Sequence, residues 1–177
     1  MTQMEKSRRK DLQAIIDRDY DYRTYSDDDV VVAEVGKHGL GLFANRQFLP
    51  GELVIEISGQ VLRQDEYGAS SYVMELSKKL YLEPGIPGAF ANHSCNPNSE
   101  LIRLTKYTMG LVAICNLEAG TEICYDYQWP ALEWIPRCRC NSPNCRGWVV
   151  AEKEISKMKK IAKRKSSKQN GKKSRAH

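Results

Sequence analysis

The apolar residues of this chain recur in short runs that fit strands better than helices. Val30–Val35 is rich in β-branched residues, and Leu53–Ile57 is a second apolar run of strand length. Further strands are predicted at Leu42–Ala44, Tyr72–Leu76, Leu80–Glu83, Leu101–Leu104, Met109–Ile114 and Glu122–Tyr127. Turn-forming residues separate these runs, notably at Pro84–Gly88. The pattern predicts a mainly β protein with few helices.

Polar residues dominate both ends of the chain. Residues 1–29 read as a polar leader in which only Asp11–Ile16 favours a short helix. Residues 151–177 are rich in Lys, Ser and Gln and poor in apolar side chains. We expect a helix over Glu152–Lys165 and a disordered end beyond it.

Charge is distributed unevenly along the chain. The net charge is +5, but the segment from Ala151 onward holds 11 Lys and Arg against 2 Glu, a net of +9. The first 150 residues therefore carry a net charge of −4. This asymmetry favours a body that attracts a cationic substrate and a tail that contacts an anionic partner such as nucleic acid.

Length and hydropathy restrict the class of protein. A chain of 177 residues with 41% hydrophobic side chains fits one domain with a real core. It lacks a run of 18 apolar residues, so we expect no membrane span. The charged start Met1–Lys6 has no apolar region typical of a secretory signal, which predicts an intracellular protein.

Six cysteines are present, and their spacing favours metal over disulfides. Cys138, Cys140 and Cys145 lie close together in a C-x-C-x4-C pattern, and a reducing compartment disfavours disulfides. Cys95 is the fourth thiol that a tetrahedral zinc site requires. The remaining two, Cys115 and Cys124, lie in apolar runs and are predicted to be buried structural thiols.

Three other segments are candidates for chemistry. Asn92–Asn98 is crowded with hydrogen-bonding groups between two apolar stretches. In the predicted strand Glu122–Tyr127, Tyr125 and Tyr127 would share one face, because successive strand residues point to opposite sides. Taken alone, such a pair is more often an aromatic core stripe than a catalytic site. The turn Gly36–Gly41 is, by itself, an ordinary glycine turn.

Together these segments resemble a known family. Asn-His-Ser-Cys-x-Pro-Asn at 92–98, Glu-x-x-Tyr-Asp-Tyr at 122–127 and Cys-x-Cys-x4-Cys at 138–145 are similar to the motifs of SET-domain protein lysine methyltransferases. The resemblance implies a fold of several small curved sheets with a knot-like C-terminal crossing. It places the SET domain at 30–130 and a zinc-bound post-SET segment at 131–150. The segments carrying Asn92–Asn98 and Tyr127 are then expected to meet.

The resemblance also implies roles for individual residues. Tyr127 corresponds to the catalytic tyrosine, and Tyr125 to the position that controls methyl number. Zn²⁺ with a structural role would be held by Cys95, Cys138, Cys140 and Cys145. S-adenosylmethionine would be bound by His38, Gly39, Leu40, Gly41, Tyr72, Asn92, His93 and Trp148.

Two positions depart from the family pattern. Ile57 stands where the family often has an active-site tyrosine, which implies a less aromatic lysine channel. Ala89 stands where many members have an arginine that contacts the cofactor. Residues 84–88 also form a tight connection, so the insert with which many members read the substrate peptide is nearly absent.

The function implied is methyl transfer from S-adenosylmethionine to a lysine of a basic protein, histone or histone-like, with mono- or dimethylation favoured. The compartment would be a nucleus, its own or a host's, or a prokaryotic cytoplasm. Two other hypotheses remain open: a non-catalytic SET-like adaptor that binds peptide or nucleic acid, and a zinc-dependent nucleic-acid module. The acidic body speaks against the second, because a nucleic-acid footprint is basic.

Overall fold

The computed structural model describes residues 25–36, 39–66 and 73–173, which fall into two compact units. The first unit consists of the chain up to Asn92 together with Pro97–Tyr125. The second consists of His93–Asn96 together with the chain from Asp126 onward. The short helix expected over Asp11–Ile16 lies outside the described residues.

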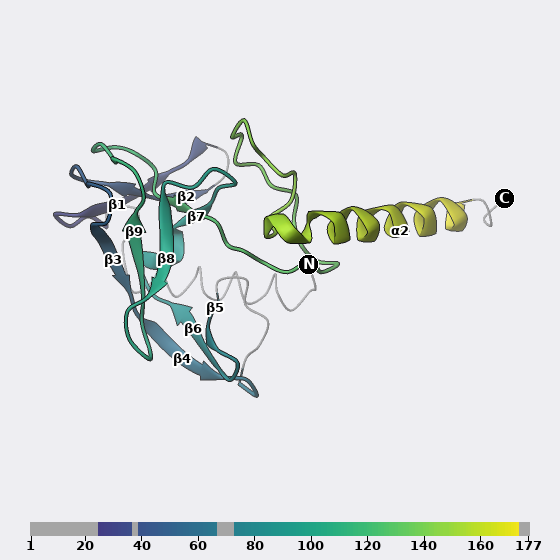
Figure 1. Cartoon of the computed structure of the whole chain (residues 1–177), viewed down its shortest axis with the longest axis horizontal. Coiled ribbons are helices and arrows are strands. Elements are labelled where there is room, and N and C mark those ends of the chain that lie inside the picture. The colour runs from purple at the N-terminus through teal and green to yellow at the C-terminus, as the bar shows by residue number, and fades with distance from the viewer. Residues whose placement is uncertain (1–24, 37–38, 67–72, 174–177) are drawn as a thin grey trace. The chain divides into compact units, whose positions relative to one another are not determined.

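Short strands in three small sheets build the first unit (Figure 1). One sheet pairs β1 (Val30–Glu34) with β2 (Leu40–Ala44) in antiparallel fashion. A five-stranded sheet has the order β3-β9-β8-β10-β7 and a three-stranded sheet the order β4-β6-β5. Their bounds are β3 Leu53–Ile57, β4 Gly59–Arg63, β5 Met74–Ser77, β6 Leu80–Pro84, β7 Asn92–His93, β8 Ser99–Arg103, β9 Met109–Ala113 and β10 Cys124–Tyr125. The prediction of a mainly β fold with several small sheets is confirmed.

Alternating apolar residues explain how these strands form a core. In β1, Val30 and Val32 are fully buried while the residues between and after them are not. In β9, which lies between β3 and β8, Met109, Leu111 and Ala113 are all buried. Full burial of a side chain such as Leu111 stabilises the fold by about 1.5–3 kcal/mol. The buried face of β9 thus anchors the sheet that carries β10.

The predicted strand over Glu122–Tyr127 is wrong in its extent. Glu122 forms only an isolated bridge with Phe43, and β10 contains just Cys124 and Tyr125. β10 pairs with β8 in parallel through a single register pair, Tyr125 with Ser99. Tyr127 lies beyond the strand, so strand alternation does not put the two tyrosines on one face.

The predicted burial of Cys115 and Cys124 is not confirmed. Cys115 is exposed, not buried, because β9 ends at Ala113 and the chain bends there; its Sγ lies 4.0 Å from the carbonyl oxygen of Asn98. Cys124 is only partly buried. The strand β4 is not among the predicted strands.

The second unit has little regular structure before its helix. A 3-10 turn, η4 (Glu152–Glu154), leads into α2 (Ile155–Lys173), which extends beyond the predicted helix end (Figure 1). Its core consists of Ala131, Ile135, Val149, Val150 and Met158. Among the residues described, no helix is long and apolar enough to cross a membrane. The knot-like C-terminal crossing stays a prediction.

Candidate functional site

In the first unit, the start of β2, where the predicted turn Gly36–Gly41 ends, packs against Asn92. Asn92 Nδ2 donates to the carbonyl oxygen of Leu40 at 3.1 Å and to Glu122 Oε1 at 2.9 Å. Gly39 has a φ of +105°, a conformation that favours glycine. Gly41 is required for a different reason: a Cβ there would lie 2.4 Å from Val35 Cγ2. The side chain of Asn92 therefore braces the start of β2, within the segment for which the family resemblance predicts a cofactor contact.

Two predicted cofactor-binding residues, His38 and Tyr72, lie outside the residues that the structure describes. Their roles stay predictions, as do those of Gly39, Leu40 and Gly41 toward the cofactor. Ile57 is fully buried beneath Gly88, where an added Cβ would meet its side chain at 2.8 Å. Position 57 is therefore part of the core of the first unit.

Asn98 and Ser99 hold the strand that carries Tyr125. The side-chain amide of Asn98 donates to the carbonyl oxygen of Glu122 at 2.8 Å, and its Oδ1 accepts from the amide of Cys124 at 2.9 Å. Ser99 Oγ donates to the carbonyl oxygen of Cys124 at 3.0 Å. Tyr125 itself is buried, and burial raises the pKa of its phenol above the ordinary value. The phenol is therefore neutral at physiological pH.

In the second unit, His93 contacts the segment that carries Tyr127. The amide of Tyr127 donates to His93 Nδ1 at 3.3 Å, and the two rings meet edge to face with centroids 5.3 Å apart. Burial lowers the pKa of His93 to about 4, although the nearby carboxylate of Asp126 opposes the shift. The imidazole is thus neutral. Because Nδ1 accepts a hydrogen bond, the proton resides on Nε2, 3.4 Å from Cys95 Sγ.

This contact confirms that the segments carrying Asn92–Asn98 and Tyr127 meet. The two residues involved, His93 and Tyr127, are 34 positions apart in the sequence. The neutral state of His93 is consistent with a bracing role and not with that of a general base poised near neutral pH.

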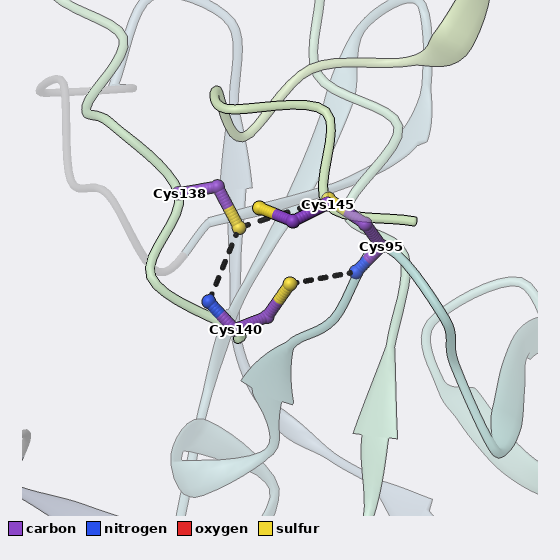
Figure 2. A group of neighbouring side chains, drawn as sticks. All are labelled: Cys95, Cys138, Cys140 and Cys145. Carbon is purple, nitrogen blue, oxygen red and sulfur yellow. Dashed lines mark hydrogen bonds between the residues drawn. The ribbon is translucent and has the colours of Figure 1, made fainter. Parts of the chain in front are cut away.

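Four thiols converge in the second unit (Figure 2). The Sγ atoms of Cys95, Cys138, Cys140 and Cys145 all lie within 4.8 Å of one another. Cys95 Sγ and Cys138 Sγ are 3.7 Å apart. A tetrahedral zinc site with Zn–S bonds of about 2.3 Å separates its sulfurs by about 3.8 Å. The separation of this pair therefore suits zinc.

Backbone amides around the cluster favour thiolates. The amide of Cys95 donates to Cys140 Sγ at 3.5 Å, that of Cys140 to Cys138 Sγ at 3.4 Å, and that of Arg146 to Cys95 Sγ at 3.4 Å. Partial burial disfavours the thiolate of Cys140, but hydrogen bonds from Ser142 and the Cys95 amide outweigh it and lower the pKa of Cys140 to about 6. Burial raises the pKa of Cys138. A set of four cysteines is closed and indicates a structural metal site.

Trp148 lies beside the cysteine cluster in the sequence and contacts Arg137. The two residues form an isolated antiparallel bridge, and the Arg137 guanidinium lies 4.1 Å from the centre of the indole ring. Trp148 also packs against the core of the second unit. Its predicted role over the adenine of the cofactor stays a prediction.

Sequence reasoning missed an ion pair between the tyrosine segment and the cysteine cluster. Arg146 Nη1 and Nη2 donate to the two carboxylate oxygens of Asp126, each at 2.7 Å. Both side chains are only 13% exposed. No short-range pattern links residues 20 positions apart; the only signal was an acidic residue between two tyrosines and an arginine directly after the last cysteine.

Sequence reasoning also missed an aromatic series next to Tyr127. The ring centroids of Tyr127 and Trp129 are 5.0 Å apart, and those of Trp129 and Trp134 are 5.3 Å apart. Trp134 is 42% exposed. The series thus extends from the predicted catalytic tyrosine to the surface of its unit.

The chain is similar to known proteins. A family model described as SET domain matches residues 39–128, slightly more than half of the chain. The chain is 32% identical over 146 residues to a variant-silencing SET domain-containing protein of Plasmodium falciparum, covering 71% of this chain and 6% of that one. It is 30% identical over 151 residues to an H3 lysine-36 specific histone-lysine N-methyltransferase of Emericella nidulans, covering 75% and 15%.

A third relative is the mouse histone-lysine N-methyltransferase NSD3, 30% identical over 145 residues, which cover 72% of this chain and 10% of that protein. The chain thus spans a small part, between 6% and 15%, of the length of these three relatives.

Proposed function

The chain belongs to the SET-domain family, and from this membership we propose that it is a protein-lysine N-methyltransferase. The observation that supports the proposal best is the contact between His93 and Tyr127, which brings two of the family motifs together. Relatives named as histone-lysine methyltransferases support the same reaction class.

The reaction is an in-line displacement. Bound S-adenosylmethionine supplies an electrophilic methyl group on a sulfonium. The lysine nitrogen forms the new C–N bond as the C–S bond breaks, and the sulfur leaves with the bonding electrons as a neutral thioether. The amine must be neutral, although free lysine has a pKa of about 10.4. Desolvation lowers that pKa, so that the proton leaves to water.

Under this proposal the protein mainly positions the reacting groups. Orientation alone can contribute a large share of the acceleration. Tyr127 holds the amine by a hydrogen bond, and its backbone is fixed in turn by His93. Tyr125, a buried neutral phenol, limits the space for an already methylated nitrogen and favours mono- and dimethyllysine. The residues from Gly39 to Gly41, Asn92, His93 and Trp148 bind the cofactor.

The cysteine cluster would hold one Zn²⁺ with a structural role. Its sulfur atoms and amide donors fit four thiolates around a cation. The metal would tie Cys95, which follows His93 by two residues, to Cys138, Cys140 and Cys145.

The proposed substrate is a lysine of a basic protein, histone or histone-like. The net charge of −4 over the first 150 residues would attract such a protein. The tail would contact nucleic acid, because α2 carries no acidic residue but six basic ones in its first eleven positions: Lys157, Lys159, Lys160, Lys163, Arg164 and Lys165. The names of the relatives support a nuclear site of action, in its own or a host nucleus; a prokaryotic cytoplasm is the alternative that the sequence allows.

A methyl-transfer assay tests the proposal. Purified protein is incubated with mixed core histones and S-adenosylmethionine, and both S-adenosylhomocysteine and the mass of each histone are measured. We expect methylated lysine, and we expect Tyr127→Phe to lower kcat by about 10² or more. Tyr107→Phe is the matched control, because Tyr107 is 50% exposed in a turn after β8 and should leave the rate unchanged.

The same assay decides between the proposal and the adaptor hypothesis. The departures at Ile57 and Ala89 favour an adaptor that binds peptide without catalysis. Histone binding without any product above the enzyme-free background, with the Tyr127→Phe protein indistinguishable from wild type, would establish the adaptor and refute the methyltransferase.

A further inference from the structure

Asp126 has no role in the proposed reaction, yet it is the most connected polar side chain described in the second unit. Its carboxylate accepts two hydrogen bonds from Arg146, each at 2.7 Å, and two from Gln128, one from the backbone amide at 3.2 Å and one from Nε2 at 2.5 Å. His93 Nδ1 lies 3.6 Å away. Asp126 also directly precedes Tyr127 in the chain.

We propose that the Asp126–Arg146 ion pair transmits the geometry of the cysteine cluster to Tyr127, which makes Arg146 a positioning residue for the reaction. The inference rests on the proposed function of Tyr127. It goes beyond that function because it assigns the cysteine cluster a defined connection to the reacting centre through one named pair.

One end of the connection is fixed by the cluster. Arg146 directly follows Cys145, and its backbone amide donates to Cys95 Sγ at 3.4 Å. The backbone of Arg146 is therefore held by two of the four sulfur-bearing residues. Its guanidinium donates two parallel hydrogen bonds to Asp126. This geometry fixes the orientation of the carboxylate as well as its distance.

The other end fixes the backbone on both sides of Tyr127. Asp126 precedes it, and Gln128, whose amide donates to Asp126, follows it. The amide of Tyr127 donates to His93 Nδ1. Gln128 has a φ of +52°, uncommon for a residue other than glycine, so the turn after Tyr127 depends on these contacts.

The pair is shielded from water, which makes it sensitive to substitution. Both side chains are 13% exposed, whereas Arg63 and Asp65 in the first unit form a pair that is 75% and 81% exposed. Removal of one partner of a shielded pair leaves an uncompensated charge. The effect of a single substitution would therefore combine the loss of positioning with the effect of the unpaired charge. A double substitution that removes both charges separates the two effects.

The test compares four variants of the full chain. Arg146→Lys keeps the charge and loses the two-pronged geometry; Arg146→Met removes the guanidinium but keeps the amide that donates to Cys95. The neutral double variant Asp126→Asn/Arg146→Met removes both charges, and Arg63→Met is the control. For each, kcat and KM for a histone peptide, zinc per chain, and hydrogen–deuterium exchange of the peptides containing Tyr127 and Cys140 are measured.

We expect Arg146→Lys and the neutral double variant to lower kcat by about tenfold or more, because small displacements of a positioned group are costly, with KM within about twofold. Zinc should remain at one per chain. Exchange should rise in the peptide containing Tyr127 and not in the one containing Cys140. The Arg63→Met control should match wild type throughout.

Several results would overturn the proposal. Recovery of wild-type kcat in the neutral double variant would show that the single variants suffer only from an unpaired charge. Loss of zinc from Arg146→Lys would show that the pair stabilises the cluster and transmits nothing. If the wild type transfers no methyl group, the proposed function fails, and the exchange data alone then decide whether the pair couples cluster and tyrosine segment: unchanged exchange at Tyr127 refutes the coupling.

Discussion

Replacement of Gly41 by alanine tests how tightly the start of β2 is packed. A Cβ at this position would lie 2.4 Å from Val35 Cγ2, 2.9 Å from Glu122 Oε1 and 3.1 Å from Asn92 Nδ2. Non-bonded carbon atoms are most stable at about 3.5–4.0 Å. The strain comes from these contacts and not from the backbone, because Gly41 is not among the glycines with positive φ.

The expected cost in stability combines two destabilising effects and one stabilising effect. Overpacking of this kind typically destabilises by about 1–3 kcal/mol. Displacing Asn92 from Glu122 weakens a hydrogen bond with a net contribution of about 0.5–1.5 kcal/mol. Against this, alanine restricts the unfolded chain and stabilises by about 0.4–1 kcal/mol. We therefore expect a net loss of about 1–3 kcal/mol, which corresponds to a decrease in Tm of about 2–4 °C per kcal/mol.

Thermal and guanidinium unfolding of the purified variant measure this loss. Gly85→Ala is the matched control, because Gly85 is exposed and its Cβ would meet only the carbonyl oxygen of Ser58, at an ordinary 3.4 Å. The control should stay within about 0.5 kcal/mol of wild type, or be slightly more stable. A Gly41→Ala protein as stable as this control, with an unchanged m value, would show that the start of β2 does not press against Val35 and Asn92.

Three further predictions concern the metal, the product and the tail. Cys140→Ser should lower zinc from one per chain and lower Tm, whereas Cys115→Ser, at an exposed thiol outside the cluster, should change neither; elemental analysis of active wild type without zinc would contradict this. Tyr125→Phe should raise the number of methyl groups per lysine in intact-mass spectra, and a wild type that already trimethylates would show that Tyr125 sets no limit. Replacement of the exposed Lys159, Lys160 and Arg164 by glutamine, which leaves the buried Met158 in place, should weaken nucleic-acid binding and lower its salt slope by about 0.9 per lost phosphate contact, with cofactor affinity unchanged; an unaltered slope would contradict tail docking.

The sequence predicted the main strands because their apolar residues alternate or form short β-branched runs. β1, β3, β6, β8 and β9 all lie within or next to the predicted ranges. The pattern was least informative where burial depends on the point at which a strand ends. Cys115 looks like a continuation of an apolar strand, but β9 stops at Ala113 and leaves that thiol exposed.

The strand over Glu122–Tyr127 was overestimated for a physical reason. Its backbone groups at Glu122 and Cys124 are satisfied by the side chain of Asn98, so they do not need a longer ladder. When a side chain takes the place of a neighbouring strand as the hydrogen-bond partner, the hydrophobic periodicity of the sequence does not reveal it. Tyr125 consequently lies inside β10, in the first unit, whereas Tyr127 lies beyond the end of β10, in the second unit.

The candidate site was predictable only where its chemistry is local. Three of the cysteines lie within eight residues, and thiol spacing of that kind indicates a metal directly; the structure brings Cys95 to the same cluster. The pairing of Asp126 with Arg146 had no such signal, because it depends on two loops without periodic structure. The roles of Tyr125, Tyr127 and the cofactor-binding residues rest on the resemblance to the SET-domain family and stay predictions.

The crowding of polar residues in Asn92–Asn98 has a structural explanation. The segment leaves the first unit after Asn92, contributes His93–Asn96 to the second unit, and returns at Pro97. Asn92 and Asn98, at its ends, bind the side chain and the backbone of Glu122 within the first unit. In its middle, His93 accepts from the amide of Tyr127 in the second unit. The asparagine and histidine side chains of this segment thus bond to backbone groups of other segments, at Leu40, Glu122, Cys124 and Tyr127. Within the segment, Ser94 Oγ bonds to the amide and the carbonyl oxygen of Asn96. Because buried backbone groups require hydrogen-bond partners, these contacts give a polar motif between two apolar stretches a structural role of its own.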